Sequence, residues 1–157
     1  MSETQNVIVV GVDGSPASDR ALEWAMQEGR RRGSTVEVVT AWGHVGHVGS
    51  LAESSVTREA REAAETAQVR QIDKVADAYR DDVTLSCEVV EGPPVERLVD
   101  AARHAGLLVV GSHGYGRARE NLVGSVTAGC ILNATCPVVV LPAPHLEPLE
   151  SQALQPR

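Results

Sequence analysis

The chain has 157 residues, of which 43% are hydrophobic and 22% charged, and its formal net charge is −7. This length and balance predict one globular domain, and the acidic charge argues against nucleic acid as a partner, because phosphate contacts need clustered Lys and Arg. No apolar run approaches the ~20 residues that span a bilayer. The first six residues lack the basic segment and apolar core of a signal peptide, so we expect a cytoplasmic protein with no membrane partner.

The residue pattern in the first third of the chain predicts two strands with one helix between them. Val7 to Val12 is almost uniformly apolar and β-branched, which is typical of a central parallel strand. Ser15 suits the N-cap of the following helix and Pro16 its first position, while three arginines and Gly33 end the helix near Arg32. Residues 35–41 predict a second strand.

A glycine-containing loop over residues 42–50 is expected to be flexible. A long helix should then run from near Leu51 to Tyr79. Its expected apolar stripe consists of Ala52, Val56, Ala60, Ala63, Ala67, Ile72, Val75, Ala76 and Tyr79.

The second half of the chain repeats the alternation of strands and helices. Residues 83–89 alternate apolar and polar side chains, as in a strand near a sheet edge. The further expected elements are a helix that begins at Pro93-Pro94 and is stopped by Gly106, a strand over 107–110, a helix from Ser125 to about Asn133 and a strand over 137–141.

This alternation predicts an α/β fold, an open five-stranded parallel sheet with helices on both faces. The chemistry-bearing residues follow the first and fourth strands, so we expect the order 3-2-1-4-5, in which those strands flank the point where ligands bind. The predicted domain covers residues 1–141. Residues 142–157 form a Pro-rich tail that we expect to be disordered.

The most informative stretch is Gly111 to Ser125, which joins a buried strand to a helix start and contains glycines at 111, 114, 116 and 124. Such a junction offers unpaired backbone N–H groups and a partial positive charge, which suit a phosphate. Glycines also allow close backbone approach and positive φ. The alternative is that they only build a long turn, for which four glycines are more than needed.

The spacing Gly111-x-x-Gly114, nine residues, then Gly124-Ser125 resembles the ATP-binding signature of the universal stress protein family. Val-Ile-Val-Val-Gly-Val-Asp-Gly-Ser near the N-terminus and Cys-Pro-Val-Val-Val after the loop extend the resemblance over residues 7–141. It implies a Rossmann-like nucleotide-binding fold with ATP as cofactor, together with Mg²⁺. It also implies a homodimer in which the strand over 137–141 pairs across a two-fold axis.

The candidate cofactor-binding residues are Gly11, Asp13, Ala41, Val110, Gly111, His113, Gly114, Gly124, Ser125, Val126 and Thr127. Asp13 is expected to bind a ribose hydroxyl or a phosphate-bound Mg²⁺, with helix capping as the alternative. The family resemblance implies that Ala41, at the end of the second strand, uses backbone groups to recognise adenine. Val126 and Thr127 would supply N–H groups, and Thr127 also its hydroxyl.

Other reactive side chains give weaker evidence of a functional site. Arg117 and Arg119 suit phosphate but are more commonly solvent-facing loop charges. His44 and His47 have ligand-like spacing but no third ligand nearby, so no metal site is predicted. The three cysteines form no Cys-x-x-Cys pair, and reduced, buried thiols are expected.

These observations favour an ATP-binding stress-response regulator, a nucleotide-dependent sensor or switch with an unknown protein partner. The alternative is a slow ATPase or nucleotidyl-transfer enzyme. A Walker-type loop needs Gly-Lys-Ser/Thr, but the only lysine is Lys74, and no catalytic constellation is identified. A phospho-receiver fails because Asp13 stands alone, and scarce aromatics disfavour a flavin module.

Overall fold

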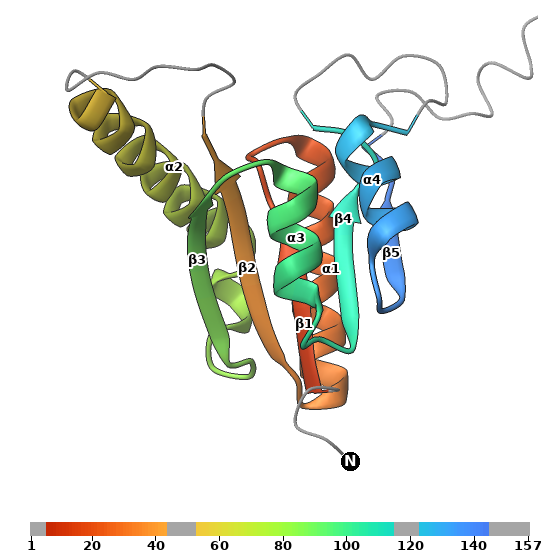
Figure 1. The fold of residues 1–157 in the computed structure, drawn as a ribbon. Coiled ribbons are helices and arrows are strands. Elements are labelled where there is room, and N and C mark those ends of the chain that lie inside the picture. The colour runs from red at the N-terminus through yellow and green to blue at the C-terminus, as the bar shows by residue number, and fades with distance from the viewer. Residues whose placement is uncertain (1–5, 44–52, 115–122, 145–157) are drawn as a thin grey trace, which may run out of the picture.

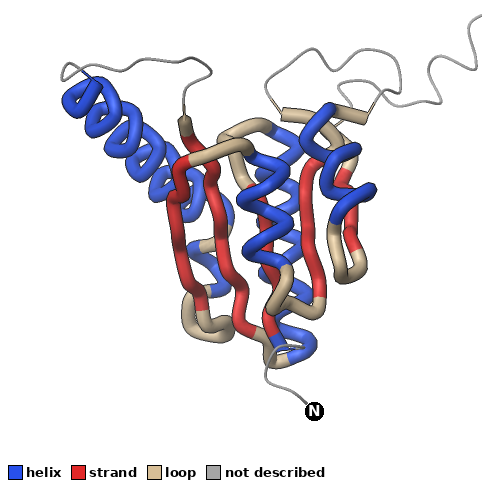
Figure 2. Tube along the Cα trace, viewed as in Figure 1, coloured by secondary structure: helices blue, strands red, loops and turns tan. Residues whose placement is uncertain are grey.

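The computed structural model describes residues 6–43, 53–114 and 123–144. Along the chain the elements are β1 (Val7–Gly11), α1 (Pro16–Arg32), β2 (Thr35–Trp42), α2 (Glu53–Val75), the short 3₁₀-helix η2 (Asp77–Tyr79), β3 (Leu85–Glu91), α3 (Pro94–Ala102), β4 (Leu107–Gly111), α4 (Ser125–Asn133) and β5 (Val138–Leu141). Figure 1 shows their arrangement and Figure 2 the loops that join them.

The five strands form one sheet in the order β3-β2-β1-β4-β5, and every neighbouring pair is parallel. The predicted fold class and strand order are therefore confirmed. Strand β3 lies at an edge, as its alternating pattern indicated. Because all strands point the same way, the loops after them gather at one end of the sheet, at the top of Figure 1.

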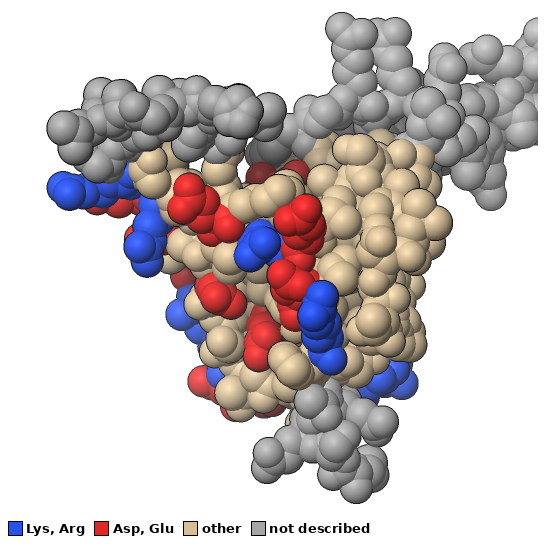
Figure 3. All heavy atoms as spheres, viewed as in Figure 1, with Lys and Arg blue, Asp and Glu red and all other residues tan. Residues whose placement is uncertain are grey.

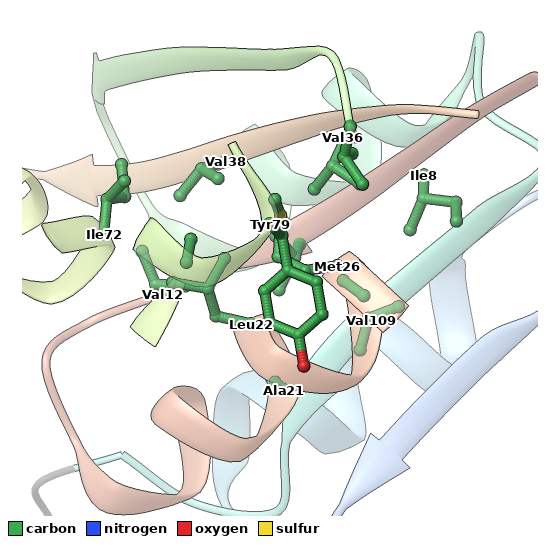
Figure 4. Packing of buried hydrophobic residues seen from close by; sticks show 14 of the residues in the cluster. Ile8, Val12, Ala21, Leu22, Met26, Val36, Val38, Ile72, Tyr79 and Val109 are labelled. Carbon is green, nitrogen blue, oxygen red and sulfur yellow. The ribbon is translucent and has the colours of Figure 1, made fainter. Parts of the chain in front are cut away.

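The sheet separates two hydrophobic cores. Helix α1 and the last turns of α2 cover one face, where Leu22, Met26 and Ile72 pack on Ile8 and Val38 (Figure 4). Helices α3 and α4 cover the other face, in front of the sheet in Figure 1. Their core contains Val9, Val39, Leu98, Ala102, Leu108, Val110 and Cys130. Helices on both faces bury all but one end residue of each of the central strands β1 and β4, which explains their continuous apolar runs.

Both predicted ends of α1 are confirmed. Ser15 is the N-cap, its Oγ accepting the N–H of Ser18 at 3.2 Å, and Pro16 occupies the first turn. Gly33 ends the helix in the left-handed conformation at φ 66°, a conformation that favours glycine. The turn before this helix is therefore fixed by the helix's own serine.

The long second helix differs from its prediction. It ends at Val75, and Asp77–Tyr79 continues as the separate η2. Ile72, Ala76 and Tyr79 are buried as expected. Ala60, Ala63 and Ala67, which were expected on the buried stripe, are exposed. Alanine has a high helix propensity but little apolar surface, so a helix can form at these positions without packing on the sheet (Figure 1).

Smaller differences concern element ends. Strand β3 starts at Leu85 rather than at residue 83, because the Val83 N–H bonds back to the Tyr79 carbonyl. Helix α3 ends at Ala102, four residues before Gly106. Cys130 is buried, but Cys87 is exposed, which corrects the expectation of buried thiols.

Several predictions fall outside the described residues. They concern most of the loop at 42–50, His44, His47, Arg117, Arg119 and most of the tail at 142–157. Among the described helices, none is long and apolar enough to cross a membrane.

Candidate functional site

The candidate site lies where β1 and β4 end side by side in the sheet. Strand β1 continues into α1 on one face and β4 continues toward α4 on the other, so a crevice opens between the two connections. A pocket occupies this crevice. Its lining residues are Gly11, Val12, Asp13, Ser15, Ser18, Val39, Ala41, Pro94, Leu98, Val110, Gly111, His113, Gly114, Val126 and Thr127.

All candidate residues chosen from the sequence line this pocket except Gly124 and Ser125. Reasoning from the sequence missed the serines of the α1 turn and much of the apolar wall. Val39 carried a usable signal, because it lies two residues before Ala41 and so on the same side of β2. Leu98 comes from α3, and no local pattern places that helix beside the glycine loop.

The apolar wall is formed by Val39, Leu98 and Val110, which are buried and meet at the base of the crevice. Gly11 allows α3 to approach, because a Cβ there would lie 2.9 Å from the Leu98 side chain. The result is a hydrophobic floor beneath a polar rim, a combination typical of small-molecule sites.

Asp13 stands at the rim and is exposed to solvent. Its Oδ1 accepts the N–H of Ser15 at 2.9 Å, and its own N–H donates to Ser18 Oγ at 3.3 Å. Ser15 rather than Asp13 is the N-cap, but the Asp13 carboxylate accepts the N–H of that cap residue and so has a structural role at the start of α1. The carboxylate is thus held by one oxygen while Oδ2 is directed toward Gly114 across the crevice.

The glycines at the start of the loop act through close approach. A Cβ at Gly114 would collide with Asp13 Oδ2, and one at Gly111 would lie 2.8 Å from the backbone of Ala17. Positive φ is found instead at Gly14, Gly33, Gly43 and Gly92 among the described glycines. The expectation that the loop glycines provide positive φ therefore finds no support at residues 111, 114 and 124.

Helix α4 begins at the same crevice. Gly124 is its N-cap, at φ −62° and ψ 158°, and has no side chain to bond the first turn. Ser125 is the first helical residue rather than the cap. The N–H groups of a first helical turn have no partner within the helix, so this end offers donors and positive potential to an anion.

Thr127 corrects one expectation. Its hydroxyl donates to the Gly111 carbonyl at 2.6 Å and so joins α4 to the end of β4. The proton of this hydroxyl is therefore committed within the fold.

The described ends of the loop are tied to neighbouring elements. Ser112 N–H donates to the Leu141 carbonyl at 2.7 Å, and Gly124 N–H donates to the Ser112 carbonyl at 2.8 Å. Ser112 Oγ and His113 Nδ1 lie 2.6 Å apart. The loop therefore leaves and re-enters the fold through fixed points, one of which is the end of β5.

A sequence profile of the universal stress protein family matches residues 5–142. The chain belongs to this family. Curated relatives in Mycobacterium tuberculosis include universal stress protein Rv2005c, 37% identical over 136 residues and 85% of this chain, and Rv1996, 34% identical over 141 residues and 88% of this chain. The chain spans 44% of each relative's length.

Solved universal stress proteins share the fold. UspA from Lactobacillus plantarum aligns with a TM-score of 0.74 at 22% identity, covering 87% of this chain and 98% of that one. A universal stress protein in complex with cAMP gives 0.65 at 23%, covering 90% and 99%. The Archaeoglobus fulgidus protein in complex with dAMP gives 0.52 at 25%, covering 85% and 95%.

Proposed function

We propose that this universal stress protein binds ATP, together with Mg²⁺, in the crevice between β1 and β4 and acts in the cytoplasm as a nucleotide-dependent regulator. One observation carries the proposal: the Asp13 turn, the start of the glycine loop and the first turn of α4, which no side chain caps, line one pocket over an apolar floor. A nucleotide needs this combination, because its base is apolar and flat while its phosphates are anionic.

The residues present fit such a ligand. The apolar floor with Val39 and Leu98 suits the base, and the backbone near Ala41 suits recognition of its edge. The Asp13 carboxylate suits a ribose hydroxyl or Mg²⁺, whose preferred ligands are oxygens. The first N–H groups of α4, beside the bare backbone of Gly114 and Gly124, suit phosphate oxygens. Bound Mg²⁺ would offset phosphate charge beside Asp13.

Two observations favour binding and regulation over rapid turnover. Among the pocket-lining residues that the structure describes, none is Lys or Arg. Lys74, the chain's only lysine, lies on α2, where its Nζ pairs with Asp19 Oδ2 at 2.7 Å. Efficient phosphoryl transfer relies on positioned cations near the transferred group. The cAMP and dAMP complexes of solved relatives support an adenine nucleotide as the ligand class.

The homodimer belongs to the same proposal. In the described sheet β5 pairs with β4 along one side only, which leaves its other edge for a partner strand. Ile131 and Leu132 of the neighbouring α4 are 52% and 82% exposed. The face over α4 shows no charged side chain in Figure 3, whereas charges cover α3 and β3. This edge suits a second copy.

The test begins with protein purified under native conditions and then denatured, so that any released nucleotide is identified by chromatography. Calorimetry then compares ATP, ADP and GTP with and without Mg²⁺. We expect ATP to bind most tightly, and more tightly with Mg²⁺. Neither released nucleotide nor heat on adding Mg·ATP would contradict the proposal. Sustained Mg²⁺-dependent phosphate release, lost in Asp13→Ala, would favour the slow ATPase.

A further inference from the structure

Gln71, in the second half of α2, makes three hydrogen bonds to the start of α1 and the turn before it. Its Oε1 accepts the Gly14 N–H at 3.0 Å. Its Nε2 donates to Ser18 Oγ and to Asp19 Oδ1, both at 2.8 Å. A helix far along the chain is therefore bonded directly to the turn that carries Asp13.

The amide of Gln71 has only one orientation that satisfies its neighbours. Gly14 presents a donor and the Asp19 carboxylate presents an acceptor. If the amide oxygen and nitrogen were exchanged, two donors would meet at Gly14 and two acceptors at Asp19. Gln71 is only 5% exposed, and a buried polar group without its partners is destabilising. The turn and α2 are thus locked in one relative position.

The bonds continue from Gln71 to the pocket. Ser18 Oγ, which accepts from Gln71, also accepts the Asp13 N–H and donates to the Ser15 carbonyl. Ser18, Ser15 and Asp13 all line the pocket, but Gln71 does not. A shift of the Asp13 backbone would therefore be passed through Ser18 Oγ to the contacts of Gln71.

Gln68 is a natural comparison, because it lies one turn earlier on α2 and is equally buried at 5% exposure. Its amide donates to the Glu88 carbonyl at 2.9 Å and to Thr40 Oγ1 at 3.0 Å. These partners belong to β3 and β2. Gln68 anchors α2 to the sheet, whereas Gln71 anchors it to the Asp13 turn.

We propose that Gln71 is a positioning residue that couples α2 to the nucleotide site. It holds the Asp13–Ser15 turn in its binding geometry, and in return an occupied site holds α2 more firmly. Reciprocity follows from linkage, because a contact that favours binding must itself be favoured by the bound ligand. The inference rests on the proposed nucleotide function. It adds the path by which an occupied site is reported at the molecular surface.

The experiment compares wild type, Gln71→Leu and Gln68→Leu. Both variants keep a long side chain and remove one buried amide, so both should lose similar stability in urea unfolding. Calorimetry with Mg·ATP should show about 10-fold weaker binding for Gln71→Leu, within the usual range of coupling between sites. Gln68→Leu should bind within about twofold of wild type.

Amide hydrogen exchange measures an effect of ATP on α2 that a purely structural role of Gln71 would not produce. ATP should slow exchange over residues 68–75 and at Gly14 in wild type. In Gln71→Leu at saturating ATP, this slowing over 68–75 should be lost. The wild-type measurement needs no variant and so stands even if a variant fails to fold.

The outcomes separate the two proposals. Wild type that binds no ATP overturns the proposed function and the coupling with it. Wild type that binds ATP without slower exchange in α2 overturns the coupling alone. So does equal loss of affinity in both variants, which would reflect stability only.

Discussion

The carboxylate of Asp13 and the backbone of Gly114 face each other across the crevice so closely that a side chain at position 114 would collide with Oδ2. The two residues are far apart in the sequence and come together because β1 and β4 are neighbours in the sheet. The absence of a side chain at Gly114 therefore lets the Asp13 carboxylate keep its position. It leaves room for the carboxylate to stand at the rim and for a ligand to contact bare backbone.

We expect Gly114→Ala to weaken Mg·ATP binding by about 10-fold or more, ~1.4 kcal/mol, because the added methyl group displaces the Asp13 carboxylate. Gly114 is exposed, so the unfolding midpoint should change little. Calorimetry and thermal unfolding on one sample check both statements. Unchanged affinity in Gly114→Ala would show that the close approach of Gly114 to Asp13 does not contribute to binding.

Asp13→Asn separates charge from geometry. The amide oxygen can still accept the Ser15 N–H, so the turn should persist, but the negative charge that favours Mg²⁺ is lost. We expect the advantage of Mg·ATP over metal-free ATP to shrink by about 10-fold, ~1.4 kcal/mol. Titrations with and without Mg²⁺ measure it, and an unchanged ratio of affinities contradicts a metal-facing role.

Ser15→Ala tests the cap of α1. The variant leaves the Ser18 N–H without its side-chain acceptor, which should cost ~1 kcal/mol of stability and lower Tm by about 3 °C. Ser86→Ala, at an exposed position on the edge strand β3, is the matched control and should leave Tm within about 1 °C. Calorimetric melting compares the two variants, and equal values for both would refute the capping role.

Leu132→Asp tests the proposed homodimer. Leu132 is 82% exposed, so a charge there should leave the folded subunit intact but oppose burial against a second copy. We expect sedimentation to show a dimer for wild type and a monomer for the variant. Val69→Asp, at a 55% exposed site on α2, should remain dimeric. A monomeric wild type would exclude the dimer.

Cys130 gives a prediction in pH. Burial raises the pKa of its thiol above the ordinary value of 9.0. The unfolded chain therefore releases this proton first, so the thiol's contribution to stability is complete below about pH 9 and is lost as pH rises toward the folded-state pKa. Between pH 8 and 10 the free energy of unfolding should fall less steeply in Cys130→Ala than in wild type. Urea unfolding at each pH measures how the stability of each protein changes with pH. Equal changes in Cys130→Ala and wild type would contradict the prediction.

The sequence predicted the sheet well because its strands are short apolar runs covered on both faces. Val7–Gly11 and Leu107–Gly111 carry that signal clearly. The prediction from sequence failed where residues form a helix without being buried. The alanines of the first half of α2 follow helical periodicity, but periodicity says nothing of whether a partner surface lies opposite.

The site was predictable where one short segment supplies both the geometry and the chemistry. The Asp13 turn and the glycine loop are of this kind. Leu98 and Gln71 could not be assigned from the sequence, because their roles depend on how α3 and α2 pack. A weak signal existed for Gln71. Stepping back four residues from the buried Ile72 reaches Gln68, and Gln71 lies three residues after Gln68 on the same buried face of the helix.

The partial anchoring of α2 has a mechanical consequence. With ~1.5 Å of rise per residue, the start of the helix at Glu53 lies about 27 Å along its axis from Gln71. The contacts of Gln68 with the sheet lie about 22 Å from Glu53, so a tilt of about 10° there would carry the far end through about 4 Å. Under the proposed coupling, a small change in the angle of α2 at its anchored end would therefore be magnified at its outer end.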